Sequence, residues 1–424
     1  MELTKEQILT KIKNYEKDKK PRLDNLYKYY RGEHDILKTT KPKGKPNNKL
    51  VINYPKNIVN NTTGYYLGIP VKYSSKDEIL SEQVQEITEY NDDAFHNMKI
   101  GKNLSVYGLA AEVLYLDSDA EIRYANINPS SVIADYSDDV EHNIIRAIRW
   151  YDITDDNANT VRHIEQYTDK EVIYYHQQED SELIEDNRSA HYFNDIPINI
   201  YENNDDGLGD FEDVISLVDA YNVMQSESVN DFQKFADALL AIKNVCVDEE
   251  VVKSIRDNNI LELQGDSTEA GWLVKSVNDT YVENIKNRLE KDIYMASATV
   301  NMSDDNFANN ASGVAIKYKL MCMENRVSVT ERNFKKALQR RFELICNVLN
   351  IKGGNYDYKT IDIAFNRNIP ANIQEVATTI QQLDGIVSKK TLLNQIPFID
   401  NVDEEVEAVE KELSFGILDG GTNG

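Results

Sequence analysis

The chain has 424 residues, of which 47 are Lys or Arg and 72 are Asp or Glu, giving a formal net charge of −25. With 41% hydrophobic and 28% charged residues, the composition excludes an intrinsically disordered chain, and the length predicts two or three domains. The longest unbroken apolar run has five residues, Ala238 to Ile242, which excludes a transmembrane helix. So much negative charge also argues against tight binding to the DNA backbone.

The cysteines and the N-terminus predict a protein that stays in the cell that makes it. The cysteines are Cys246, Cys322 and Cys346, an odd number without a close pair, which fits a reducing cytosol better than a disulfide framework. The first twenty residues lack the apolar core of a signal peptide.

Charge is distributed unevenly along the chain. Residues 1–50 carry 14 basic and 7 acidic groups, residues 201–240 carry 10 acidic groups and one lysine, and residues 314–350 carry 8 basic and 3 acidic groups. Such blocks are typical of solvated helix faces, and they also suggest surfaces of opposite sign that meet within the molecule or between copies.

The first part of the chain is predicted to be mainly helical. Apolar residues recur at helical spacing over 4–31, with a break near Pro21, and a basic loop rich in Lys, Pro, Gly and Asn follows over 39–49. A helical face over 58–62, an extended piece over 71–73, and two helices around 79–87 and 94–109 complete this part.

Residues 111–201 change to short β-rich segments separated by Asp, Asn and Ser turns. No connection between them is long enough for a helical crossover, so we predict an antiparallel meander. The acidic loop 203–210, with Gly207 and Gly209, ends this region and resembles a domain boundary.

Helical periodicity dominates the rest of the chain. Residues 211–242 contain no Gly or Pro and predict one helix, a mixed segment follows over 243–275, and 277–299 predict a second helix. An Asn-rich loop over 301–313 precedes 37 residues, 314–350, without Gly or Pro, which predict a helix of roughly 55 Å at about 1.5 Å per residue. A strand near 356–365 and three short helices over 370–413 complete the prediction.

Motifs of catalysis are absent from the sequence. It contains no Walker A sequence, no His-x-x-x-His pair, no Gly-x-Ser-x-Gly and no Glu-x-Lys ending of a nuclease motif. Acidic pairs such as Asp205-Asp206 and Asp304-Asp305 have the oxygen ligands that hard cations prefer, but we interpret them as ordinary acidic loops. We therefore predict a protein that is not an enzyme and has no cofactor and no metal site.

The chain contains 25 tyrosines, several of them in pairs such as Tyr65-Tyr66. Paired aromatics are typical of stacking platforms for nucleic acid, but these lie in an acidic chain without interleaved Arg. We favour packing in the core and at interfaces.

Four stretches resemble one known family, the portal (head-tail connector) proteins of tailed bacteriophages, specifically those of long-tailed phages of Gram-positive bacteria. The first is YYRGEHDIL (29–37) together with NYPKNIVNNTTGYYLGIPVKY (53–73), and the second is FQKFADALLAI (232–242). The third runs from SGVAIKYKLMCMENRV to FELI (312–345), and the fourth runs from FNRNIPANIQEV to EAVEKE (365–412). The resemblance covers nearly the whole chain, although 111–200 match only in character.

The resemblance implies an α+β portal fold with a mixed α/β wing, a helical stem, a small α/β clip, a long tunnel helix and a helical crown. It places the wing at 1–210 with a return strand at 351–369, stem helices at 211–242 and 276–299, and the clip at 243–275. The tunnel loop would be 300–312, the tunnel helix 313–350, the crown 370–413, and 414–424 a disordered tail. The order of two helices with a small insert, a loop and a 37-residue helix is unusual for a monomer. It is explained if the helices of several copies pack side by side around an axis.

The family's function implies a ring of about twelve copies at one capsid vertex, through which double-stranded DNA enters during packaging and leaves during ejection. The implied partners are the large terminase subunit, a head-tail adaptor, the major capsid and scaffolding proteins, and DNA that passes without sequence-specific binding; no membrane is involved. The implied location is the virion, after assembly in the host bacterial cytoplasm.

Two groups of residues are candidates for the channel. The DNA-facing tunnel loop would present Asn301, Asp304, Asp305, Asn306, Phe307, Asn309 and Asn310. The long helix would present a basic face made of Lys317, Lys319, Arg326, Arg332, Lys335, Lys336, Arg340 and Arg341. We favour pairing of this face with acidic groups of a neighbouring copy, such as those in 201–240, and the alternative is that it faces the tunnel.

Two other classes of protein compete with this interpretation. A non-enzymatic acidic cytosolic adaptor or scaffold protein, monomeric or dimeric, would use the acidic surface to bind a partner and would form no ring. An acidic enzyme with an unrecognised site is disfavoured by the missing motifs.

Overall fold

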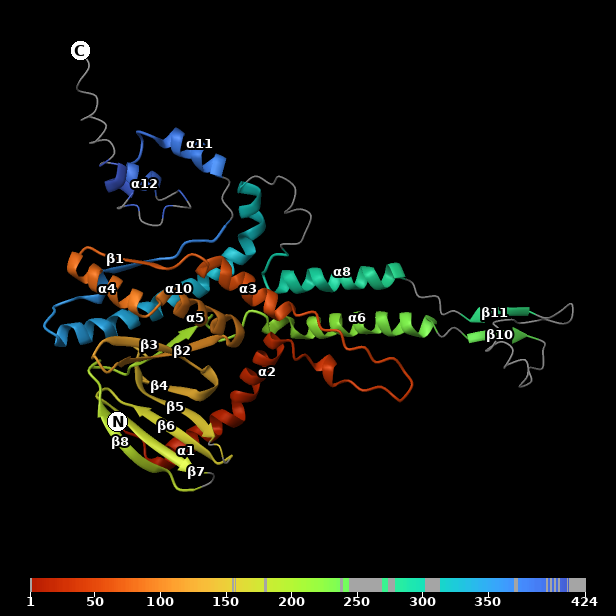
Figure 1. The fold of residues 1–424 in the computed structure, drawn as a ribbon, viewed down its shortest axis with the longest axis horizontal. Helices are drawn as coiled ribbons and strands as arrows, with labels where there is room; N and C mark the ends of the chain where they lie inside the picture. Colours follow the sequence, from red (N-terminus) through yellow and green to blue (C-terminus); the bar gives the residue numbers. More distant parts are fainter. Residues whose placement is uncertain are drawn as a thin grey trace, which may run out of the picture. The chain divides into compact units, whose positions relative to one another are not determined.

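The computed structural model describes residues 2–154, 156, 158–178, 181–236, 239–243, 269–273, 279–301, 313–369, 373–393, 396, 399, 402, 405–409 and 411. The chain divides into two compact units, Met1–Val300 with Cys322–Asn366, and Asn301–Met321 with Arg367–Gly424. Helices and antiparallel strands come in largely separate runs along it, which confirms the α+β class (Figure 1).

The N-terminal helical run is two helices, α1 (Lys5–Asp18) and α2 (Lys20–Arg31). Thr4 and Gln7 form a capping box at the start of α1, and Pro21 lies in the first turn of α2, where its missing N–H costs no hydrogen bond. Gly32 ends α2 with a φ of 87°, a left-handed conformation that glycine adopts without strain. The break predicted near Pro21 is therefore confirmed.

Three further helices and a short strand follow. The helices are α3 (Tyr54–Leu67), α4 (Glu78–Tyr90) and α5 (Asp93–Tyr107), and the strand is β1 (Lys72–Ser75), between α3 and α4 in the sequence; all lie close to the predicted positions. Helices α3 and α5 approach closely at Gly101, where a Cβ atom would lie only 2.3 Å from Leu67 Cδ1 and 2.9 Å from the Tyr66 hydroxyl. A side chain at position 101 would therefore require the side chains of Leu67 and Tyr66 to shift.

The β-rich region forms two antiparallel sheets. Strands β4 (Val132–Tyr136), β5 (Ile144–Thr154), β6 (Thr160–Tyr167), β7 (Glu171–Gln178) and β8 (Ile184–Ala190) are a five-stranded meander, as predicted. Strands β2 (Leu109–Leu116), β3 (Ile122–Ile127) and β9 (Ile198–Glu202) form a second sheet in the order β3-β2-β9. The return of β9 to β2 joins residues that lie about ninety apart in sequence, which periodicity alone does not reveal.

The middle of the chain is a pair of helices with a small β-hairpin at their ends (Figure 1). After η3 (Glu212–Val214), α6 (Ile215–Ala236) packs against α8 (Asp279–Ala296), and between them β10 (Leu239–Lys243) pairs with β11 (Glu269–Leu273). The helix predicted over 211–242 is thus shorter at both ends. Residues 239–243 are a strand because their backbone pairs with a segment thirty residues downstream, a non-local choice.

The predicted long helix is confirmed as α10 (Gly313–Ile351), whose 39 residues span about 58 Å. After η4 (Tyr358–Thr360), β12 (Ile361–Ala364) pairs antiparallel with β1. In the second unit, α11 (Ile373–Leu383) and α12 (Lys389–Leu393) match two of the three predicted short helices, and residues 405–409 are helical as well.

Tyrosines and aliphatic side chains build the core of the first unit. Its central cluster joins α2, α3, α5, α6 and α8 through residues that include Tyr29, Ile58, Phe211, Val218 and Ile293, all at most 2% exposed. The base of the helix pair is therefore fixed to the helices of the N-terminal region. No helix within the described ranges has the length and apolar character needed to cross a bilayer.

Candidate functional site

The predicted tunnel-loop residues lie mostly outside the described part of the chain. Asn301, which is partly buried, is described. The remaining loop residues proposed from the sequence fall outside it, namely Asp304, Asp305, Asn306, Phe307, Asn309 and Asn310.

The basic residues of α10 divide into two groups. Five of them are exposed or partly exposed: Lys317, Lys319, Arg332, Lys335 and Lys336. The other three, Arg326, Arg340 and Arg341, form ion pairs with acidic groups of their own chain. The predicted basic face therefore does not extend to Arg341, which is 0% exposed.

Arg341 lies at the centre of a buried polar network between α10, α5 and the three-stranded sheet. Its Nη1 donates to Asp93 Oδ1 at 2.7 Å, and its Nη2 donates to Glu112 Oε2 at 2.8 Å and to Asn97 Oδ1 at 3.0 Å. The guanidinium also lies 4.5 Å from the ring centroid of Tyr124. A charge so completely removed from water needs this full set of partners.

Glu112 is the acidic centre of the same network. Besides Arg341, it accepts hydrogen bonds from the Tyr201 hydroxyl at 2.7 Å and from Asn199 Nδ2 at 2.9 Å, and it lies 2.8 Å from His96 Nε2. Burial alone would raise the pKa of Glu112, but the Arg341 charge and His96 outweigh burial and lower that pKa below its usual value. Glu112 is therefore ionised and balances the charge of Arg341.

The sequence contains one signal for this network. Glu112 is the single charged residue in the strand LAAEVLYL, whose neighbours Ala111 and Val113 are buried. A lone carboxylate in such a strand requires a buried cation or several donors. The sequence around Glu112 does not reveal which cation pairs with it, because Arg341 lies 229 residues away.

Two further arginines attach α10 to the rest of the first unit. Arg326 Nη2 donates to Asp210 Oδ1 at 2.7 Å, and its Nη1 donates to the Ser297 carbonyl just after α8. Arg340 Nη1 donates to Asp195 Oδ2 at 2.9 Å. The acidic stretch 201–240 thus does pair with the long helix at Asp210, but within one subunit.

A second site, which sequence reasoning missed, lies along α6. Asn222, Ser226 and Asn230 recur every fourth residue and are at most 1% exposed. Their side-chain oxygens accept the backbone N–H groups of Ile52 at 2.9 Å, Leu50 at 2.9 Å and Asn48 at 2.8 Å, respectively. Four residues of an α-helix advance about 6.0 Å, close to the roughly 6.6 Å that two residues of an extended chain advance, so every second residue of the extended segment meets every fourth residue of the helix.

This hydrogen-bond ladder holds the basic loop, which we call the arm (residues 39–52), against α6. Lys41 pairs with Glu227 of the same helix. At the base of the arm, buried His34 packs on the ring of Tyr29 at 4.8 Å, and its Nδ1 accepts from Asn222 Nδ2 at 2.8 Å. The signal in the sequence that could have predicted this ladder is the spacing of four between Asn222, Ser226 and Asn230 in an otherwise amphipathic helix.

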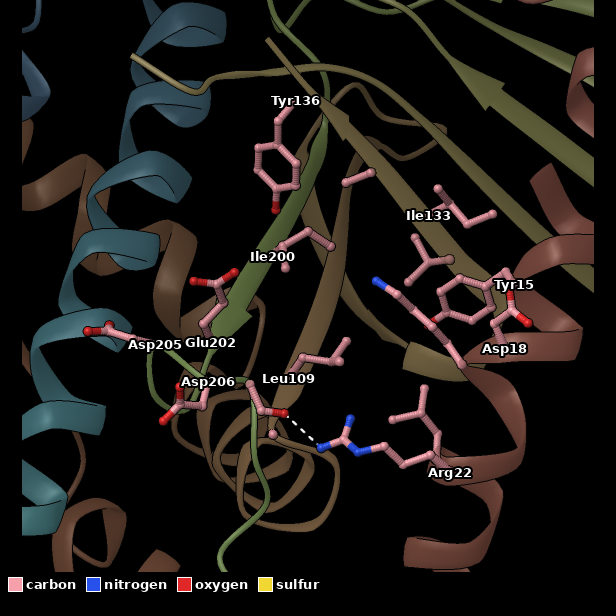
Figure 2. A pocket seen from close by; sticks show the side chains of 16 residues that line it. Tyr15, Asp18, Arg22, Leu109, Ile133, Tyr136, Ile200, Glu202, Asp205 and Asp206 are labelled. Atoms are coloured by element: carbon pink, nitrogen blue, oxygen red, sulfur yellow. Dashed lines mark hydrogen bonds between the residues drawn. The ribbon is translucent and has the colours of Figure 1, made fainter. Parts of the chain in front are cut away.

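A cavity of about 550 Å³ lies between the start of α2 and the sheet that contains β2 and β9 (Figure 2). Leu109, Ile133 and Ile200 provide apolar lining. Arg22, on α2, donates to both carboxylate oxygens of Glu212 at 2.5 and 2.6 Å and to the Gly207 carbonyl at 2.9 Å, so its charge is already neutralised. The acidic residues at the cavity are Asp18, Glu202, Asp205 and Asp206.

Among the described residues, no group of three or more His, Cys, Asp or Glu side chains is arranged to hold a metal ion. What the described residues do offer is a structural framework: a projecting helix pair, a long helix fixed by three arginines, and a rigidly held basic arm.

Comparison with known proteins assigns the class. The chain belongs to the phage portal protein family, SPP1 Gp6-like, whose model matches residues 9–414, and it is therefore a phage portal protein. It is 24% identical over 417 residues to the portal protein of Bacillus phage SPP1, covering 91% of this chain and 82% of that protein. It is also 24% identical over 413 residues to the portal protein of Clostridium phage phiCD119, covering 89% of each.

Proposed function

We propose that copies of this chain assemble into a ring of about twelve at one vertex of the capsid and form the channel for double-stranded DNA. The observation that carries the proposal is the family match over residues 9–414. In this role the chain is a structural component of the virion without a catalytic step, assembled in the cytoplasm of the host bacterium.

The two projecting helices support assembly side by side. Phe232 on α6 is 76% exposed, and Tyr281 and Met295 on α8 are 63% and 70% exposed. Large apolar side chains at this level of exposure favour burial against another surface. Neighbouring copies of the same helix pair would supply that surface in a ring.

Each part of the chain has a role in this proposal. The stem would be the helix pair, with the clip between its helices docking first the large terminase subunit and later the head-tail adaptor. The wing, residues 1–210 with 351–369, would meet the major capsid and scaffolding proteins, and the crown, 370–413, would face the packaged genome. The tunnel loop, 300–312, would approach the DNA.

The remaining basic residues of the long helix are proposed to lie between subunits. Lys335 is partly exposed, and Arg332 and Lys336 are exposed on the same helix whose three other arginines are neutralised internally. A ring of such side chains facing DNA would bind phosphates and slow its passage. Pairing with acidic groups of the next copy avoids that cost.

Purified protein tests the ring directly. Negative-stain microscopy should show annular particles with a central hole, and size-exclusion chromatography with light scattering should give a mass of about 580 kDa for about twelve chains of 48.6 kDa. Monomers or dimers alone, at every salt and protein concentration tried, would contradict the proposal and favour the adaptor alternative.

A further inference from the structure

One side of α6 is exposed along the first half of the helix. Ser216, Ala220 and Val223 are exposed there, and Val223 has 45% of its surface open to solvent. An α-helix turns about 100° per residue, so these three residues lie roughly 140° to 200° around α6 from Val218, which is buried in the core. We call this strip the α6 flank. Its two small residues would let another helix approach closely.

The arm borders the α6 flank and reaches over it farther along the helix. The ladder residues Asn222 and Asn230 lie roughly 40° and 120° around α6 from Val218, between the core side and the flank. Lys41 of the arm pairs with Glu227, which lies about 180° from Val218 and so continues the line of the flank. A helix that packs on this side would therefore meet α6 itself in its first half and the arm in its second half.

Helix α8 carries an exposed stripe on the side that faces away from α6. Tyr281 and Met295 are 63% and 70% exposed, and the side chain of Arg288, midway between them, is 83% exposed. These three residues, which we call the α8 stripe, lie roughly 200° to 240° around α8 from Ile293, a buried member of the core cluster that joins α8 to α6. Arg288 Nε lies 3.8 Å from Asp292 Oδ2 on the same helix, a weak surface pair that leaves the guanidinium available to a further carboxylate.

The α6 flank and the α8 stripe stand at equal levels along the helix pair. The two helices are antiparallel, with the β10-β11 hairpin at their far ends (Figure 1), and Val218 and Ile293 belong to one core cluster near the opposite ends. Five residues along each helix from that pair, about 7.5 Å, stand Val223 on α6 and Arg288 on α8. By the same count, the other equal-level pairs are Ser216 with Met295 and Asn230 with Tyr281. Rotation about a ring axis brings equal levels of adjacent copies together.

We propose that the α8 stripe of each copy packs on the α6 flank of the next copy, and that the arm of this next copy lies between the two helices in their far half. Met295 would pack on Ser216, Arg288 would pair with Glu227, and Tyr281 would rest on the arm. This inference rests on the proposed ring and identifies the surfaces that meet in it.

Three properties point to a second copy as the occupant of the α6 flank. The flank and the stripe lie on opposite sides of one helix pair, as a head-to-tail contact requires. Their charges are complementary, because the guanidinium of Arg288 comes within one helical turn of the level of Glu227. The arm is rich in lysine, and an exposed tyrosine ring such as that of Tyr281 attracts cations to its face.

Disulfide trapping in the full chain tests the contact between the helices. Val223→Cys with Arg288→Cys is made in a chain that also carries Cys246→Ser and Cys322→Ser, so that buried Cys346 is the remaining native thiol. Mild oxidation should link these rings into a ladder that extends to about twelve chains on a non-reducing gel.

The matched control combines Val223→Cys with Met295→Cys in the same background. Met295 lies seven residues from Arg288 along the same stripe, about 10.5 Å, and Cα atoms more than about 7 Å apart are not bridged. This offset pair should give no ladder.

Tryptic cleavage of isolated rings tests the position of the arm. Trypsin cuts in the arm after Lys43 and Lys49, the two arm lysines that no proline follows. Tyr281→Ala removes the side chain that would cover the arm and should raise the rate of these cuts by about fivefold or more. The matched control, Tyr192→Ala, at a 53% exposed position between β8 and β9, should leave the rate unchanged.

The outcomes separate this contact from the ring itself. Loss of rings in Tyr281→Ala, with rings retained in Tyr192→Ala, would also support the contact. Wild-type rings together with no ladder from the level pair, an equal ladder from the offset pair, or equal cleavage in the two tyrosine variants would overturn the docking proposal alone. A wild-type chain that forms no ring would overturn the proposed function as well.

Discussion

Arg341 illustrates how one side chain changes meaning between sequence and structure. In the sequence it belongs to a basic run on a long helix, next to Arg340. In the fold it is fully buried, with two carboxylates and an amide as acceptors, and it connects α10 to both α5 and β2. Its role is to fix the long helix inside the subunit.

Replacing Arg341 should destabilise the subunit strongly. Arg341→Met leaves Glu112 and Asp93 buried without a cation, which typically costs about 3–5 kcal/mol of unfolding free energy. Arg332→Met, on the exposed side of the same helix, should change it by less than about 0.5 kcal/mol. Urea unfolding followed by intrinsic fluorescence measures both, and equal effects of the two substitutions would contradict this account.

The buried side chain of His34, at the base of the arm, should make the folding stability of the chain depend on pH. Burial lowers the pKa of His34, although the Tyr29 carbonyl and the nearby carboxylates of Asp219 and Asp35 partly oppose it. The unfolded chain therefore takes up a proton at His34, near pH 6.5, before the folded chain does. The contribution of His34 to stability is complete above that pH and is lost as pH falls toward the lower folded pKa.

The measurement is the unfolding free energy of the wild type and of His34→Gln at pH 8, 7, 6 and 5. The wild type should lose stability relative to the variant below about pH 6.5, by at most about 1.4 kcal/mol per pH unit, because the variant lacks only this titration. A constant difference between the two proteins at all four pH values would refute the prediction.

At the scale of secondary-structure elements, the chain uses helix α6 for two purposes. Val218 packs in the core, while Asn222, Ser226 and Asn230 hold an extended segment at a spacing of four residues. The backbone N–H groups of Asn48, Leu50 and Ile52 thereby find acceptors on side chains of α6 instead of on a neighbouring strand. The same residues would be poor choices for a helix packed only against apolar surfaces.

Removing the ladder should release the arm without unfolding the helix pair. Asn222→Ala with Asn230→Ala deletes two buried acceptors, each worth about 1 kcal/mol or more, and should raise the rate of tryptic cleavage after Lys43 and Lys49 by about tenfold or more. Val223→Ala, at a 45% exposed position of α6, is the control and should leave cleavage unchanged. Mass spectrometry of the first cleavage products would locate the cuts, and cuts that begin elsewhere would argue against the ladder.

At the scale of the whole assembly, the net charge acquires a different meaning. In the proposed ring, about twelve copies at −25 each would carry about −300, and a channel surrounded by that charge would not retain a polyanion. A conduit needs weak contact with DNA, since every basic contact adds to salt-dependent affinity. The charge that argues against a DNA-binding protein thus suits a proposed channel through which DNA moves.

Deletion of residues 301–310 tests the proposed tunnel loop. Rings should still form, since the stem helices and α10 lie outside the deleted segment, but DNA packaging by phage that carries the variant should fall by about tenfold or more, an effect of about 1.4 kcal/mol on the limiting step. Ring formation is checked by microscopy and packaging by counting DNA-filled capsids. Normal packaging would remove the assignment of this loop.

The sequence by itself determined the family and most helices. Apolar periodicity identified the break near Pro21, the helices of the first hundred residues and α10, because periodicity reports which face of a local segment is buried. The resemblance to portal proteins, carried by stretches such as 312–345, was confirmed by the match over 9–414. These features depend on short stretches of chain.

Only the tertiary structure decided which distant segments meet. Strand β10 replaced the end of a predicted helix because its partner lies at 269–273, and Arg341 found Glu112 from 229 residues away. The arm became a fixed projection because three side chains of α6, about 170 to 180 residues downstream, accept its N–H groups. Pairings of this kind follow from how elements pack in three dimensions, and neighbouring residues in the sequence carry no record of them.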